Sequence, residues 1–142
     1  MDIRYQESET PTVVQALLSA LVPSSTGATV VALDGDLGAG KTTLTKEICK
    51  QLGIESEVTS PTFVLARWYE AQHVSWKQVV HIDAYRIESL DELAPLHWDT
   101  IIAQPQTLVI VEWPEHIRAV LPPDTKWFHI EHHDTERHIT SI

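Results

Sequence analysis

The sequence predicts an α/β fold in which strands and helices alternate along one sheet, and three observations support this prediction. A continuous apolar run, Thr29–Leu33, is typical of a strand that is buried on both faces. A glycine-rich turn over residues 35–40 follows it and leads into a helix in which Leu44, Ile48 and Leu52 recur every four residues. Further strand candidates then alternate with helical segments, the pattern of α/β proteins.

The other elements can be placed in chain order from local patterns. The polar segment Met1–Glu9 is either a short edge strand or a loose end. We expect a helix after it, with Thr10 as N-cap and Pro11 at the first helical position, and an end before Pro23. Gly53 suits the C-terminal cap of the helix that follows the glycine-rich turn. Strands are expected over Phe63–Tyr69, Val79–Asp83, Leu108–Glu112 and, as a terminal hairpin, over Trp127–His133 and Arg137–Ile142, with short helices over Glu88–Ala103 and Pro114–Val120.

The composition excludes several classes of protein. A chain of 142 residues predicts a single domain, 1–142. Acidic residues outnumber basic ones 20 to 10, for a formal net charge of −10, which argues against a protein that grips DNA or RNA by itself or binds an anionic membrane. Cys49 is the only cysteine, so an intrachain disulfide is impossible, and no apolar run approaches the roughly 18 residues needed to cross a bilayer. We therefore expect a cytoplasmic protein.

The clearest chemical signal is a phosphate-binding turn. Residues 35–42, Gly-Asp-Leu-Gly-Ala-Gly-Lys-Thr, match the pattern G-x-x-x-x-G-K-[ST]. The backbone N–H groups of Gly38, Ala39 and Gly40 can approach phosphate oxygens, and the helix N-terminus adds positive potential there. Lys41 should reach the β- and γ-phosphates, while the Thr42 hydroxyl should coordinate Mg²⁺. Thr43 is placed to donate to an α-phosphate. The sequence thus predicts a site for ATP and Mg²⁺.

Two predicted strands end in acids, and carboxylates are what such a site needs. Asp83 and Glu112 could both project toward Mg²⁺ and the attacking water, or one of them could only cap the next helix. The segment Thr59–Thr62 is either a loop that senses the γ-phosphate through Ser60 and Thr62 or an ordinary connection. Trp113 either packs beside the nucleotide or covers the end of the sheet.

Four segments together resemble the four motifs of the bacterial TsaE family, in the same order and at similar spacing. They are Gly35–Thr43, Ser60–Phe63, His81–Arg86 and Glu112–Glu115. The resemblance covers residues 29–115 well. Ala84 departs from the bulky residue usual before the tyrosine of the third motif, which affects local packing and partner contacts but not nucleotide chemistry.

The resemblance implies a fold and a role. The fold is a three-layer α/β P-loop NTPase domain with a central parallel sheet and antiparallel edge strands. TsaE proteins are small ATPases needed to make threonylcarbamoyladenosine at tRNA position 37, and they support turnover of the TsaD–TsaB transferase complex, through which alone they meet tRNA. The implied roles are phosphate lysine for Lys41, Mg²⁺ ligands for Thr42 and Glu112, second essential acid for Asp83, switch-like loop for Ser60 and Thr62, tryptophan near the nucleotide for Trp113, and arginine beside the adenine for Arg137.

Two other functions are weighed against this one. The first is a nucleotide-gated binding module whose hydrolysis is incidental. The second is a small-molecule kinase, which is disfavoured because the chain has only five arginines and such kinases usually use several to clamp the second substrate. The chain contains no asparagine, which excludes the Asn-Lys-x-Asp motif of common GTPases. Hydrolysis by the isolated chain should be slow, since no arginine finger is evident in the sequence.

Overall fold

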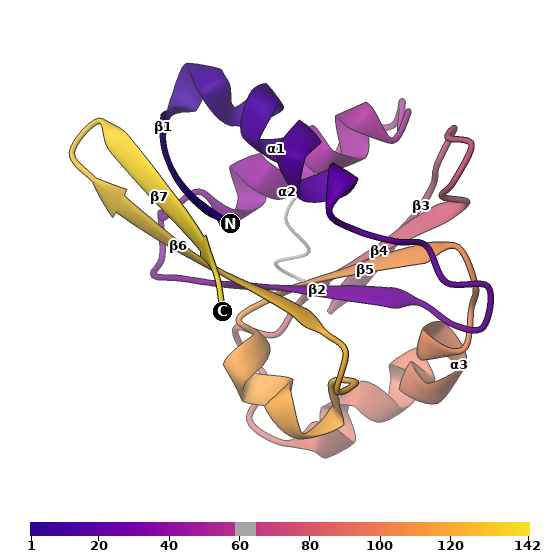
Figure 1. Cartoon of the computed structure of the whole chain (residues 1–142). Helices are drawn as coiled ribbons and strands as arrows, with labels where there is room; N and C mark the ends of the chain where they lie inside the picture. The colour runs from indigo at the N-terminus through magenta and orange to yellow at the C-terminus, as the bar shows by residue number, and fades with distance from the viewer. Residues whose placement is uncertain (59–64) are drawn as a thin grey trace.

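One twisted sheet organises the chain. The computed structural model describes residues 1–58 and 65–142, and within them seven strands form a sheet in the order β1-β7-β6-β2-β5-β4-β3 (Figure 1). The strands are β1 (Asp2–Gln6), β2 (Thr29–Asp34), β3 (Ala66–Glu70), β4 (Gln78–Asp83), β5 (Thr107–Glu112), β6 (Lys126–His133) and β7 (Glu136–Ser141). Because β1 pairs with β7, the two termini lie close together at one edge of the sheet.

The centre of the sheet is parallel and its edges are antiparallel. β2 lies between β5 and β6 and runs parallel to both, and β4 runs parallel to β5. At one edge β3 is antiparallel to β4, and at the other β7 is antiparallel to both β6 and β1. Every residue of β5 is buried, as expected for a strand covered on both faces. This arrangement confirms the predicted fold class.

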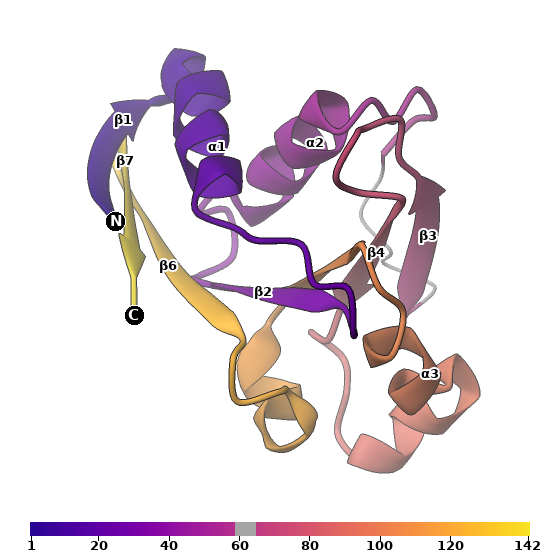
Figure 2. The same ribbon diagram turned by 45° about the vertical axis from the view of Figure 1, so that its right-hand side comes forward.

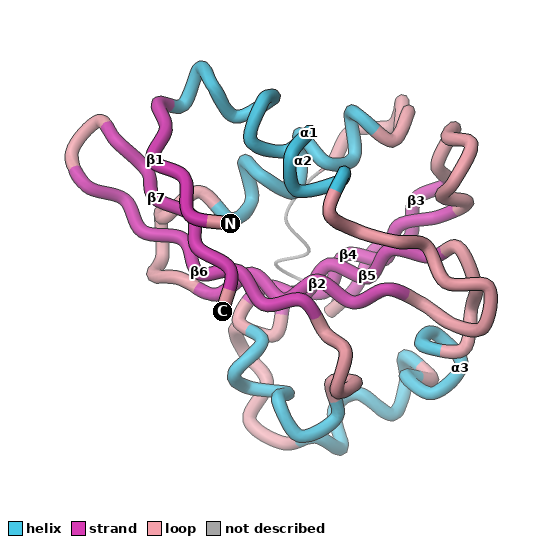
Figure 3. Tube along the Cα trace, viewed as in Figure 1, coloured by secondary structure: helices cyan, strands magenta, loops and turns pink. Residues whose placement is uncertain are grey.

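Helices cover the two faces, so the molecule has three layers. α1 (Thr10–Ser19) and α2 (Lys41–Gln51) lie on one face, and the 3₁₀-helix η2 (Leu90–Leu96), α3 (Trp98–Ile102) and the 3₁₀-helix η3 (Pro114–Val120) lie on the other (Figures 2 and 3). Each face has its own apolar core. The core under α1 and α2 contains Val14, Leu17, Leu44, Ile48 and Ile110, and the opposite core contains Val80, Ile82, Leu93, Ile101 and Val111.

Most element predictions are confirmed, with one local correction. Met1–Glu9 supplies the edge strand β1, and Glu88–Ala103 contains two short helices. Thr10 is the first helical residue and not the N-cap, which is Glu9, so Pro11 occupies the second helical position and not the first. The Thr10 hydroxyl instead donates to the carbonyl of Glu7 at 2.6 Å, since a short 3₁₀-helix, η1 (Glu7–Glu9), directly precedes α1 and places that carbonyl within reach.

The strand predicted over Phe63–Tyr69 is observed from Ala66 onward, and its first two residues lie outside the described part of the chain. Of the described helices, none is long and apolar enough to cross a membrane.

Candidate active site

The glycine-rich turn joins the C-terminal end of β2 to the start of α2, at the edge of the sheet where the parallel strands end. Gly40 has a φ of +111°, a conformation that side chains with a Cβ rarely adopt, and it directly precedes the first residue of α2. The amide of Leu44 donates to the carbonyl of Gly40 at 3.0 Å, so helical bonding starts at the turn itself. A Cβ on Gly35 would collide with the Ile130 carbonyl oxygen of β6. Glycine at position 35 therefore lets the turn start tightly against the neighbouring strand.

Lys41 is held inside this turn. The residue is 5% exposed, and its ammonium group donates to the carbonyl of Gly35. The same Nζ lies 3.6 Å from the ring centroid of Trp113, within the range of a cation–π contact. Burial lowers the pKa of Lys41, and the carboxylates of Glu112 and Glu115 oppose that change. The turn thus concentrates positive charge at the N-terminus of α2.

The two strand-end acids emerge side by side. β4 and β5 are parallel, and Asp83 is the register partner of Glu112. Glu112 is 3% exposed, and its Oε1 accepts a hydrogen bond of 3.2 Å from the Thr42 hydroxyl. Asp83 Oδ1 accepts from the backbone N–H of Tyr85 at 3.0 Å, so this carboxylate also organises the turn after β4. The fold therefore brings Thr42 and Glu112 together across 70 residues of sequence.

Trp113 lies at the end of the sheet, between Lys41 and an apolar core. It packs over Lys41 and also borders the apolar core under η2, α3 and η3. Its ring centroid lies 4.9 Å from that of Tyr85 and 6.2 Å from that of His116. Its φ of +57° is unusual for a tryptophan and turns the chain sharply between β5 and η3.

Arg137 reaches the turn from the far end of the chain. It lies on β7, and its Nη2 is 3.5 Å from Glu7 Oε2. Its side chain also packs closely on Gly40: a Cβ added to Gly40 would lie 3.3 Å from Arg137 Nε. That Nε is buried and has no hydrogen-bond partner among the described residues. The structure thus places a cationic side chain against the phosphate-binding turn, which local sequence patterns could not have indicated.

Ser60 and Thr62, which the sequence predicts as part of a switch-like loop, lie outside the described residues. His81 begins the third motif but has no role in the sequence-based prediction, and it lies in the site: its imidazole, on β4, bonds to Glu112 Oε2. A polar residue inside the apolar run Val79–Ile82 was the available signal.

These groups fit a magnesium–nucleotide complex. A carboxylate and a hydroxyl 3.2 Å apart are the hard oxygen donors that Mg²⁺ prefers. Lys41 and the unpartnered Nε of Arg137 flank the turn with positive charge and donors suited to an anionic ligand.

Comparisons with known proteins agree with one another. A family model described as "Threonylcarbamoyl adenosine biosynthesis protein TsaE" matches residues 5–139. Similar proteins named "tRNA threonylcarbamoyladenosine biosynthesis protein TsaE" occur in Rickettsia felis, with 33% identity over 100% of this chain and 78% of that protein, and in Mycobacterium tuberculosis, with 38% identity over 75% of this chain and 67% of that protein.

A solved structure, that of Bacillus subtilis YdiB, superposes with a TM-score of 0.71 at 28% identity, covering 99% of this chain and 84% of that one. The likeness supports a P-loop nucleotide-binding fold. The family match extends from β1 to β7 and so includes both edges of the sheet as well as the phosphate-binding turn.

Proposed function

The chain belongs to the TsaE family, and on that premise we propose that it is a Mg²⁺-dependent ATPase required for the threonylcarbamoyladenosine modification of tRNA position 37. The observation that carries the proposal is the hydrogen bond between Thr42 and Glu112 next to buried Lys41. It joins the phosphate-binding turn to a strand-end acid, the combination that Mg-nucleotide chemistry requires.

The roles of the residues follow from their positions. The backbone N–H groups of Gly38, Ala39 and Gly40 cradle the phosphates, and Lys41 exchanges the carbonyl of Gly35 for the β- and γ-phosphate oxygens. Thr42 and Glu112 would hold Mg²⁺, which would neutralise negative charge on the phosphates. Asp83, beside Glu112 in the sheet, orients the attacking water. The Thr43 hydroxyl donates to the α-phosphate.

The outer parts of the nucleotide meet the other residues of the site. Arg137 lies against Gly40 and has an unused buried donor, which suits a role beside the base. Trp113 borders the phosphates through its contact with Lys41. Ser60 and Thr62 respond to the γ-phosphate, a role that rests on the family resemblance alone.

The protein acts with partners. From the family resemblance, we propose that its partner is the TsaD–TsaB complex. It meets tRNA only through that complex, because a net charge of −10 disfavours direct binding to RNA. Residues 1–142 act as one ATPase domain in the cytoplasm, and hydrolysis by the chain alone is slow.

The test is reconstituted tRNA modification under multiple-turnover conditions. With TsaD, TsaB, a donor of the threonylcarbamoyl group and excess tRNA, we expect modification to stop near one round when this chain is omitted and to continue when it is present with MgATP. Asp83→Ala should still bind ATP and fail to sustain turnover, while Glu55→Ala, an exposed acid in the segment after α2, should behave as the wild type.

Unchanged turnover on omission would overturn the functional assignment. Normal turnover by Asp83→Ala would instead favour a nucleotide-gated binding module, in which ATP binding suffices and hydrolysis is incidental.

A further inference from the structure

One histidine, His81, is fully buried in the sheet at a position where an apolar side chain could pack equally well. His81 lies between Val80 and Ile82 on β4 and is 0% exposed. Its Nε2 bonds to Glu112, and its Nδ1 has no partner among the described residues. Burying an imidazole with one nitrogen unpartnered costs free energy that an apolar residue at this position would avoid. The bond to Glu112 is therefore the feature that explains the residue.

The register of the sheet makes this bond possible. His81 pairs with Ile110, and Glu112 lies two residues further along β5, so the imidazole reaches the carboxylate diagonally on the same face. That face is the one covered by α2, which starts at the phosphate-binding turn. A carboxylate only accepts hydrogen bonds, so the proton of the imidazole lies on Nε2.

The two oxygens of Glu112 consequently have different partners. Oε2 accepts from His81 in the buried interior, and Oε1 accepts from Thr42 at the phosphate-binding turn. A glutamate side chain has three rotatable bonds, and a donor on one oxygen restricts the orientation of the other. His81 thus holds Oε1 toward the turn.

We propose that His81 is a positioning residue that presents Oε1 of Glu112 to the divalent cation of the bound nucleotide. The inference rests on the proposed function in one respect, namely that Glu112 is a Mg²⁺ ligand. Carboxylates that bind metals are typically oriented by such hydrogen bonds, and losing the orienting partner typically lowers metal affinity about 10- to 100-fold.

The experiment compares His81→Leu with His81→Gln. Leucine fills the buried space without a donor, whereas the glutamine amide can place an N–H near the position of Nε2. The affinity of a fluorescent ATP analogue is measured in EDTA and again with titrated Mg²⁺, and binding of Mn²⁺ to the protein–nucleotide complex is followed by electron paramagnetic resonance.

We expect His81→Leu to weaken divalent-cation affinity about 10- to 100-fold without changing nucleotide affinity in EDTA, and His81→Gln to recover most of the loss. In a Glu112→Gln background the leucine substitution should add little further loss, since both changes act on one interaction. If His81→Leu fails to fold, the comparison is made between His81→Asn and His81→Gln instead, because asparagine is too short to reach Glu112.

Equal losses in EDTA and in Mg²⁺, or no rescue by glutamine, would overturn the inference and leave His81 a packing residue. Wild-type protein whose nucleotide binding ignores Mg²⁺ would instead contradict the proposed function, so the two failures are distinguishable.

Discussion

At the scale of single residues, Lys41 connects the turn to its surroundings. Its ammonium group is satisfied by the carbonyl of Gly35 and the face of Trp113 while it is buried beside Glu112. A buried charge is stable only with such partners, and an anionic phosphate offers stronger ones than a neutral carbonyl. The residue is therefore prepared to transfer its hydrogen bonds to a ligand.

Lys41→Ala should lower ATP affinity about 10- to 100-fold, because hydrogen bonds that involve a charged group contribute about 1.5–3 kcal/mol each. Calorimetric titration with ATP and Mg²⁺ measures the effect. Lys46→Ala, on the exposed side of the same helix, is the matched control and should bind as the wild type does. Equal affinity of Lys41→Ala and wild type would remove Lys41 from the binding site.

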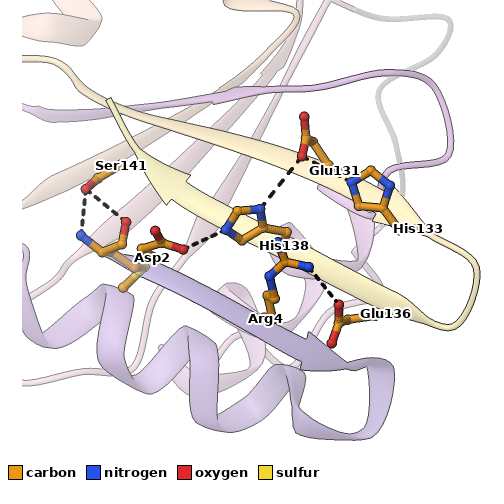
Figure 4. Close-up of polar contacts among 8 residues, drawn as sticks. Asp2, Arg4, Glu131, His133, Glu136, His138 and Ser141 are labelled. Atoms are coloured by element: carbon orange, nitrogen blue, oxygen red, sulfur yellow. Dashed lines mark hydrogen bonds and ion pairs between the residues drawn. The ribbon is translucent and has the colours of Figure 1, made fainter.

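At the scale of elements, the edge formed by β1, β6 and β7 is joined by histidine–carboxylate contacts. His138, on β7, bonds to Asp2 of β1 at 2.6 Å and lies 3.7 Å from Glu131 of β6, and the Met1 amino group donates to Ser141 of β7 at 2.7 Å (Figure 4). Within β6, His133 lies 3.2 Å from Glu131. Where β6 leaves β2, His129 bonds to Asp34 at 2.9 Å. These contacts hold the strand that carries Arg137, so the edge also supports the candidate site.

This network should make the edge sensitive to pH. The hydrogen bond to Asp34 raises the pKa of His129, so its contribution is complete below the ordinary value of 6.5 and is lost as the pH rises through the raised value. The bond to His133 lowers the pKa of Glu131, whose contribution is present above its ordinary value of 4.5 and is lost as the pH falls through the lowered value. Both contributions are complete between those two ordinary values.

His129→Gln should therefore lower the melting temperature more at about pH 5.5 than at about pH 8. Thermal unfolding followed by circular dichroism at both pH values gives the difference. His132→Gln, an exposed histidine on the same strand β6, should show little change at either pH. A larger effect of His129→Gln at pH 8 would contradict the assigned direction.

At the scale of the whole molecule, the acidic surplus is distributed unevenly. Residues 72–142 carry eleven acidic and five basic side chains, against nine and five in residues 1–71. The two basic side chains at the phosphate-binding turn, Lys41 and Arg137, are largely buried. The site can therefore attract a nucleotide locally while the outer surface is acidic, which suits a basic patch on a protein partner.

Association with the TsaD–TsaB complex should accordingly weaken as salt rises from about 0.05 M to about 0.5 M, because screening shortens the range of charge attraction. The measurement is surface plasmon resonance with TsaD–TsaB immobilised and this chain injected. The loss of affinity at high salt should appear mainly as a slower association rate. An affinity independent of salt would argue against an acidic docking face.

Much of the fold could be predicted from the sequence because its signals are local. Apolar runs mark the buried strands, four-residue spacing marks α2, and glycines mark a turn that needs positive φ. Strand-end acids could be proposed because parallel strands end at one edge of the sheet. Local patterns can mislead even at short range, as Thr10 shows. The predicted N-cap hydroxyl instead donates to the carbonyl of Glu7 in the preceding 3₁₀-helix.

By itself, the sequence determined the order of strands and helices, the phosphate-binding turn and the family. Only the tertiary structure decided which distant side chains meet: Thr42 with Glu112, Glu112 with His81, and Arg137 with Gly40. The physical reason is that a turn or a helix depends on neighbouring residues, whereas these contacts depend on β5 lying between β2 and β4 and on β7 folding back along β6. Sheet order and register are long-range properties, and no local spacing encodes them.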